Sequence, residues 1–175
     1  MTEQNTNMAL WDAVSETDPG HTKSVSQRGG FTAIDAQYQI MRATQQWGPV
    51  GGDWAYTVDH EVLWSEGGVA LAVADVTVSY MLEGFDIPRS FGPIRGINVL
   101  IDAKGRVDDD APKKALTDAL TKALSHLGFS ADVFLGLYDD NKYVEGLNAK
   151  YNRQAKAPAT GGNGKPAAAA TVEDF

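Results

Sequence analysis

The 175-residue sequence predicts an α+β fold, in which helices pack on one face of an antiparallel β-sheet. Three segments alternate apolar and polar residues as half-buried strands do. Short connections rich in glycine join them, which favours antiparallel pairing over crossovers. Apolar residues at helical spacing lie before and after these strands. The length suits one domain with a real core, so we expect a single unit.

The two ends of the chain differ from the middle in composition. Residues 1 to 20 are polar and acidic except for one apolar cluster from Met8 to Trp11. We expect a loose arm here, which is either disordered or docks through Leu10 and Trp11. Residues 154 to 175 contain APATGGNGKPAAAAT and end in VEDF, which predicts a disordered linker and an acidic tail. The folded domain should therefore span residues 21 to 153.

The first half of this domain should contain a strand and a helix. Residues 24 to 34 suggest one strand interrupted at Gly29 and Gly30, where a bulge or a close backbone approach would fit. Asp35 can accept a hydrogen bond from the first turn of a helix that runs through Gln46. The sequence GPVGG at residues 48 to 52 predicts the turn that follows it.

The three alternating segments are expected to form a meander. They cover residues 54–64, 70–82 and 94–101. In the first segment, one set of alternate residues is apolar and should lie on the buried face: Trp54, Tyr56, Val58, Val62 and Trp64. Polar residues occupy the other set, so this strand should be half-buried.

Residues 111 to 127 carry the most regular helical pattern in the chain. Apolar residues from Ala115 to Leu127 recur on one face, and the opposite face is cationic or hydroxylic. Asp108, Asp109 and Asp110 supply acceptors at the start, where Pro112 also fits, and Gly128 can end the helix. A second helix is predicted from about Asn141 to Lys156, with Asp139 or Asp140 as its cap.

Composition limits the classes of function. Cysteine is absent, which excludes disulfides and thiolate metal sites. No apolar run approaches the roughly 20 residues of a membrane span, so we expect a cytoplasmic protein with no membrane partner. The net charge is −8, yet residues 87–106 hold four cations against Asp102 alone. Since charges separated by more than about 8 Å are screened, a local basic groove remains compatible with an acidic chain.

Catalytic patterns are weak. The three histidines lack a recognisable nucleophile pattern, so no catalytic residue and no cofactor are predicted. The aspartates at 108–110, 132, 139 and 140 could bind Mg²⁺. Acidic residues before helices are more commonly caps, and no metal ligand is assigned. A metal-dependent nuclease that uses these aspartates stays an alternative.

Several motifs, taken together, point to a family. Lys113 to Gly128 reads KKALTDALTKALSHLG and Asp132 to Val144 reads DVFLGLYDDNKYV. These segments resemble phage single-strand annealing proteins of the Sak and Rad-fifty-two-like branch of the Redβ superfamily. Three earlier motifs are similar to the N-terminal half of phage members: TDPGHTK at 17–23, TAID at 32–35 and ATQQWGPVGGDW at 43–54.

The resemblance implies an oligomeric ring or filament that anneals single-stranded DNA in homologous recombination, without ATP. Its partners would be single strands, the annealed duplex intermediate and copies of itself, inside a bacterial host. DNA would lie in a basic groove between a β-hairpin region and the helices. The family's phosphate-binding positions fall at Lys113, Thr121, Lys122 and Ser125. Thr121 and Ser125 replace basic residues of eukaryotic relatives and provide hydroxyl donors of weaker attraction.

Other cations are therefore added to the predicted DNA site. The full set is Arg28, Arg89, Arg95, Lys104, Arg106, Lys113, Lys114, Thr121, Lys122 and Ser125. Phe91 is the expected exposed aromatic for base stacking. A protein that coats single strands without annealing them is a further alternative. The ending VEDF resembles the acidic tip of bacterial single-strand-binding proteins, so it either recruits their partners or is an inert tail.

Overall fold

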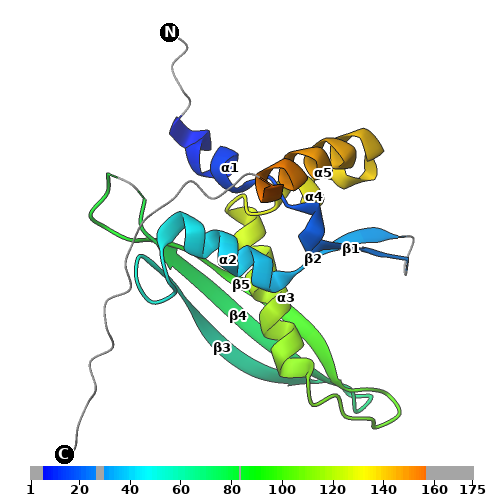
Figure 1. Cartoon of the computed structure of the whole chain (residues 1–175). Helices are drawn as coiled ribbons and strands as arrows, with labels where there is room; N and C mark the ends of the chain where they lie inside the picture. The colour runs from blue at the N-terminus through cyan, green and yellow to red at the C-terminus, as the bar shows by residue number, and fades with distance from the viewer. Residues whose placement is uncertain (1–5, 27–29, 83, 157–175) are drawn as a thin grey trace, which may run out of the picture.

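The computed structural model describes residues 6–26, 30–82 and 84–156, and it has the predicted α+β architecture (Figure 1). The strands are β1 (Thr22–Val25), β2 (Phe31–Ile34), β3 (Trp54–Trp64), β4 (Ala70–Tyr80) and β5 (Arg89–Ile101). The α-helices are α1 (Ala9–Val14), α2 (Ala36–Trp47), α3 (Ala111–His126), α4 (Ala131–Phe134) and α5 (Asn141–Lys156). Short 3-10 helices are η1 (Thr6–Met8), η2 (Pro19–His21) and η4 (Leu137–Asp139).

The main sheet is the predicted antiparallel meander, in the order β3-β4-β5. Trp54 pairs with Tyr80 at one end of β3 and β4, and Trp64 pairs with Ala70 at the other. β5 begins at Arg89 rather than at the expected residue 94, and its pairing with β4 is shifted between Val76 and Val78. Gly92 and Pro93, which are joined by a cis peptide bond, lie at this shift.

α3 covers the inner face of the sheet and lies over β4 and β5. It comes close because alanines occupy its contact face: Ala111, Ala115, Ala119 and Ala123, all 0% exposed. Gly96 of β5 lies beneath them, and a Cβ atom there would stand only 2.1 Å from the carbonyl oxygen of Ala115. The helix and the strand therefore meet backbone to backbone at this point.

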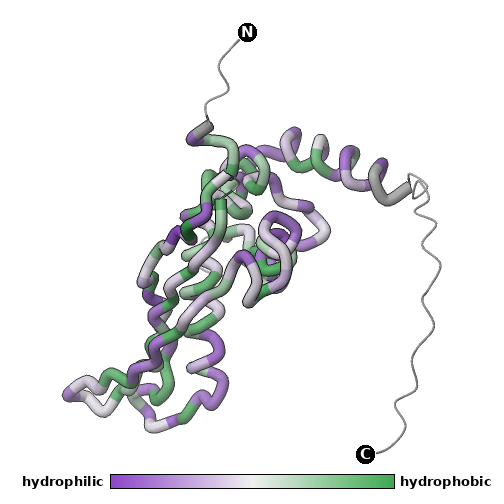
Figure 2. The backbone as a smooth tube through the Cα atoms, turned by 90° about the vertical axis from the view of Figure 1, so that its left-hand side faces the viewer, coloured by the Kyte–Doolittle hydropathy of each residue, from purple (hydrophilic) through white to green (hydrophobic). Residues whose placement is uncertain are grey.

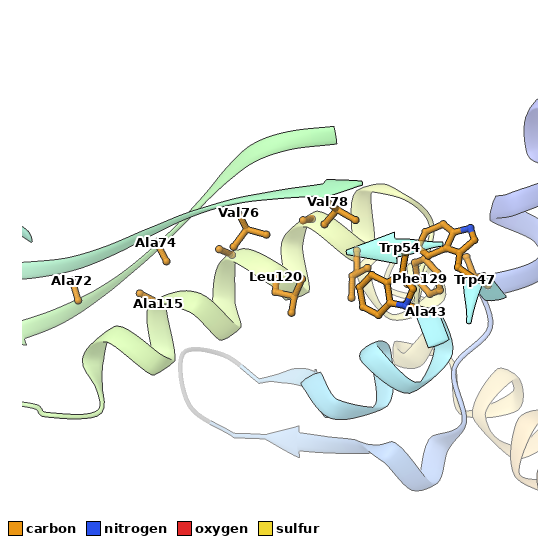
Figure 3. Packing of buried hydrophobic residues seen from close by; sticks show 14 of the residues in the cluster. Ala43, Trp47, Trp54, Ala72, Ala74, Val76, Val78, Ala115, Leu120 and Phe129 are labelled. Carbon is orange, nitrogen blue, oxygen red and sulfur yellow. The ribbon is translucent and has the colours of Figure 1, made fainter. Parts of the chain in front are cut away.

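The core continues from this contact into an aromatic cluster at one end of the sheet. Figure 3 shows small residues along β4 and α3, and Trp47, Trp54 and Phe129 gathered beyond them. The ring centres of Trp47 and Phe129 lie 5.1 Å apart in an edge-on arrangement. Apolar burial of this kind contributes roughly 25 cal/mol per Å².

Two predicted burial assignments are wrong. Val62 is 48% exposed and Trp64 is 66% exposed, although both lie on the inner side of β3. α3 makes its contacts with β4 and β5 and leaves the far half of β3 uncovered. Alternation identified the face correctly, but the extent of the covering helix decides which of its residues are buried.

The predicted single strand over residues 24–34 is also wrong. β1 and β2 pair with each other as an antiparallel hairpin, with Val25 opposite Phe31. Gly30 adopts a φ of 86° beside the turn, a conformation that glycine tolerates without strain. Gly30 therefore belongs to a chain reversal rather than to a bulge, and Gly29 lies outside the described residues.

The start of the chain is less loose than expected. Val14 is 2% exposed within the core, and Thr17 is fully buried. Trp11 packs against Gly128, whose φ of 102° ends α3 as predicted. From α1 onward, the described part of the expected arm belongs to the folded unit.

The helix starts agree with the sequence in most details. The carboxylates of Asp35 and Asp140 accept hydrogen bonds of 2.9 Å from the amides of Gln37 and Lys142. At α3, Asp110 occupies the cap position without such a bond, and the Asp108 carboxylate accepts one from the Asp110 amide instead.

Hydrophobic and hydrophilic residues alternate along α5, as Figure 2 shows for the helix that leads to the C-terminal trace.

Candidate nucleic-acid interface

An open groove of about 670 Å³ lies on the side of α3 away from the sheet. Figure 3 shows the sheet on one side of α3 and the β1–β2 hairpin on the other. The hairpin forms one wall of the groove, from Gly30 to Ile34, and α4 with η4 forms another. The polar face of α3 lies between them. Its lining residues are Lys113, Lys114, Thr117, Asp118 and Thr121.

The position of these polar residues follows from the periodicity of α3. Its alanines face the sheet, and each residue turns the helix by about 100°, so residues two positions from an alanine, such as Lys113 and Thr117, lie on the opposite side. Lys113 is exposed and forms no ion pair with any residue that the structure describes. Lys114 is held 2.6 Å from the carboxylate of Asp108. This ion pair lowers the pKa of the Asp108 carboxyl and raises that of the Lys114 ammonium group.

The α4–η4 wall is fixed by a buried carboxylate. Asp132 is 3% exposed. It accepts hydrogen bonds from the Thr17 amide at 2.8 Å, the Thr17 hydroxyl at 2.6 Å and the Tyr143 hydroxyl at 2.9 Å. The hydroxyl of Tyr138, which lines the groove, donates to the Thr17 carbonyl oxygen at 2.7 Å. These bonds tie the N-terminal segment, α4 and α5 into one support.

The phenol groups in this support remain protonated donors at neutral pH. Burial raises the pKa of the Tyr138, Tyr143 and Tyr151 hydroxyls well above 10.0. The carboxylates of Asp132 and Glu16 add to the effect because a phenolate beside them would be repelled.

Three of the ten predicted site residues line the groove: Lys113, Lys114 and Thr121. Lys122 lies on the same helix but is paired with Asp118 at 2.6 Å. The hydroxyl of Ser125 donates to the carbonyl oxygen of Lys122, one turn earlier in α3. Neither of these two family positions lines the groove.

The cations of β5 and the loop after it lie elsewhere. Arg95 is on the outer face of the sheet, where its guanidinium binds the Asp75 carboxylate at 2.6 Å and lies 3.8 Å from Glu61. Arg89 stands 4.9 Å from the ring centre of Phe85. Arg106 pairs with Asp102 at 2.6 Å, and Lys104 is exposed in the same loop. Arg28 lies outside the described residues. Of the nine predicted residues that the structure describes, only Lys113, Lys114 and Thr121 line the groove, so these nine are not gathered along one channel.

The structure also bears on the predicted stacking aromatic, on a metal site and on a membrane span. Phe91 is half-buried against His126, with ring centres 5.6 Å apart, so it is not an exposed aromatic at a hairpin tip. Within residues 6–26, 30–82 and 84–156, no group of three or more His, Asp or Glu side chains is placed to hold a metal ion. No helix in these ranges is long and apolar enough to cross a membrane.

Sequence reasoning missed the apolar part of the groove. Phe31 of β2 and Phe134 of α4 both line it, and both side chains are about half exposed. Lys23 was also overlooked; it lies on β1 opposite Ala33, a lining residue. The glycine pair at residues 29 and 30 is the signal in the sequence that could have found this apolar part. Interpreted as the turn of a hairpin over residues 22–34, this pair would have placed Phe31 beside a turn.

Comparison with known proteins does not indicate a family for this chain. No family model matches the chain, and no curated protein matches it significantly.

Proposed function

We propose that the protein binds single-stranded DNA in the groove between the β1–β2 hairpin and α3, and that it anneals complementary strands without ATP. The observation that carries this proposal is the exposed polar face of α3 within an open groove. Lys113 and Lys114 provide ammonium groups for phosphate oxygens, and threonine hydroxyls add neutral donors. Contacts of this type position a strand without reading its sequence.

The energetics of annealing fit a protein of this kind. Stacking releases roughly 1.4 kcal/mol per base-pair step, so pairing is downhill and requires no nucleotide hydrolysis. Repulsion between the two phosphate backbones slows the encounter of the strands. A protein accelerates pairing when it neutralises phosphates and leaves the base edges accessible.

One subunit would hold DNA weakly. Two lysines line the groove, but Asp118 and Asp139 line it as well. Binding through two phosphates gives a slope of log affinity against log salt of roughly 1.4, since each phosphate contributes about 0.7 on a single strand. A strand that crosses several subunits adds these contacts, and weak local binding thereby becomes useful. This argument supports a homo-oligomeric assembly.

The outer face of the sheet offers a surface for such an assembly. Ile97 is 47% exposed and Val99 is 44% exposed on the part of β5 that pairs with Leu71 and Val73. We propose that a second copy of the chain covers these residues. Sedimentation of Ile97→Glu should then show smaller particles than the unaltered protein, and an unchanged particle size would reject this surface.

An annealing assay with complementary oligonucleotides, without ATP or added metal, tests the function. We expect pairing faster than in the protein-free reaction. A rate equal to that control would reject annealing. Strands that bind but become protected from pairing would support the coating alternative. Degradation that depends on Mg²⁺ would support the nuclease alternative, which no metal-binding group in the described residues favours.

A further inference from the structure

Phosphate binding leaves one part of the groove unexplained. Phe31 is 52% exposed and Phe134 is 54% exposed, and they line the groove from β2 and α4. Single exposed apolar residues are common on protein surfaces. Two phenyl rings that line the same open pocket from distant parts of the chain are a concentrated apolar surface, which is typical of a binding site.

The rings are free to accept a flat partner. Among the described residues, neither Phe31 nor Phe134 stacks on another aromatic ring, in contrast to Trp47, Tyr80 and Phe91. A ligand that entered the groove would therefore meet ring faces and edges that no described ring stacks against.

The surrounding charges narrow the chemistry of that ligand. Lys113 and Lys114 line the same pocket as the two rings. Its volume, about 670 Å³, lies within the range of roughly 300–1,000 Å³ that is usual for small-molecule sites. A free phosphate would leave the rings unused, and a purely apolar ligand would leave the ammonium groups unused. A nucleotide carries a flat base and an anionic phosphate within one unit, and it matches both.

We propose that Phe31 stacks on a nucleobase of the bound single strand while Phe134 closes the opposite side of the same subsite. This inference rests on the proposed binding of DNA and names the residue that contacts the bases. Because every base has a π face, such stacking strengthens binding without selecting a sequence. It also holds one base in a defined position beside the phosphates that the lysines contact.

The test separates base contacts from phosphate contacts. The full chain is titrated with fluorescent oligothymidine and with an abasic strand of the same length, which keeps the phosphates and lacks the bases. The unaltered protein should bind oligothymidine at least about fivefold more tightly than the abasic strand. Phe31→Ala and Phe31→Leu should lose this preference and keep their affinity for the abasic strand, and Phe31→Trp should retain it.

Phe85→Ala is the matched control, because Phe85 is 51% exposed and does not line the groove. It should keep the preference. Two results would reject stacking by Phe31 but leave DNA binding intact. The first is that Phe31→Ala and Phe31→Leu prefer oligothymidine as strongly as the unaltered protein does. The second is that the unaltered protein binds oligothymidine and the abasic strand equally well. If the unaltered protein binds neither strand, the proposed function itself fails.

Discussion

The two faces of α3 obey different requirements. The face toward the sheet consists of alanines packed onto Gly96, where even one methyl group has no space. The face toward the hairpin carries Lys113, Lys114 and Thr117, which are exposed and line the groove. Packing against the sheet therefore restricts the alanines, and it does not restrict the residues that line the groove. Substitutions on the two faces should therefore separate stability from DNA binding.

The largest effect is expected for Gly96→Ala, which should disrupt the contact between α3 and β5. The new Cβ would stand 2.1 Å from the Ala115 carbonyl oxygen and 2.5 Å from the Ala119 amide nitrogen. Both atoms are backbone, so the whole helix must move. Overpacking usually costs about 1–3 kcal/mol, and we expect at least the upper end because no side chain can rotate away. Urea denaturation measures the change.

Gly146→Ala provides the control for that substitution. Gly146 lies within α5, and a Cβ there would meet nothing within 4 Å. Alanine should raise the free energy of unfolding by about 0.5–1 kcal/mol, because glycine weakens a helix interior. If Gly96→Ala were equally harmless, the close contact between α3 and β5 would be wrong.

The next largest effect is expected for Asp132→Ala, which should loosen the groove wall formed by α4 and η4. The substitution leaves the Thr17 amide, the Thr17 hydroxyl and the Tyr143 hydroxyl without their acceptor. Each buried unsatisfied donor costs about 1–3 kcal/mol, and Tyr143 is only half-buried, so we expect the lower end of the combined range, about 3 kcal/mol. Tyr143→Phe removes one bond and should cost about 1 kcal/mol in the same denaturation experiment. Equal stability of both variants and the unaltered protein would contradict the supporting role of Asp132.

Lys113→Glu should act on binding alone. The side chain is exposed and unpaired within the described chain, so the free energy of unfolding should change by less than about 0.5 kcal/mol. A hydrogen bond to a charged group contributes about 1.5–3 kcal/mol, and each 1.4 kcal/mol is tenfold in affinity. Fluorescence anisotropy should therefore show binding of single strands weakened about tenfold or more. Lys104→Glu is the comparison, because Lys104 is exposed in the loop after β5 and does not line the groove, and little change in affinity is expected.

The smallest effect is a gain. Asp108→Asn keeps a side-chain oxygen for the Asp110 amide and removes the charge that holds Lys114. Without this competing carboxylate, the Lys114 ammonium group can contact phosphate more strongly, while the loss of an exposed ion pair costs only about 0–1 kcal/mol of stability. We expect affinity for single strands to rise about two- to fivefold, as an ion-pair contribution of that size allows. A decrease in affinity would show that Lys114 does not contact DNA.

The sequence predicted helices better than it predicted the site. α3 and α5 were recognised with their ends because periodicity, Asp140 and Gly128 are local signals. The β1–β2 hairpin was missed, since a bulge and a turn use the same glycines and only pairing distinguishes them. The side of the sheet on which Arg95 lies, and its ion pair with Asp75, depend on the register of three strands. The groove joins segments about a hundred residues apart, which no local pattern reveals.

Site-specific crosslinking tests the central claim most directly. The chain contains no cysteine, so one introduced cysteine carries a photoreactive group at a single known position. Thr117→Cys places the group in the groove, and Thr57→Cys places it on the outer face of the sheet beside Thr77. We predict that labelled single-stranded DNA crosslinks at position 117 and not at position 57. Equal crosslinking at both positions, or crosslinking at position 57 alone, would contradict a DNA site between the hairpin and α3.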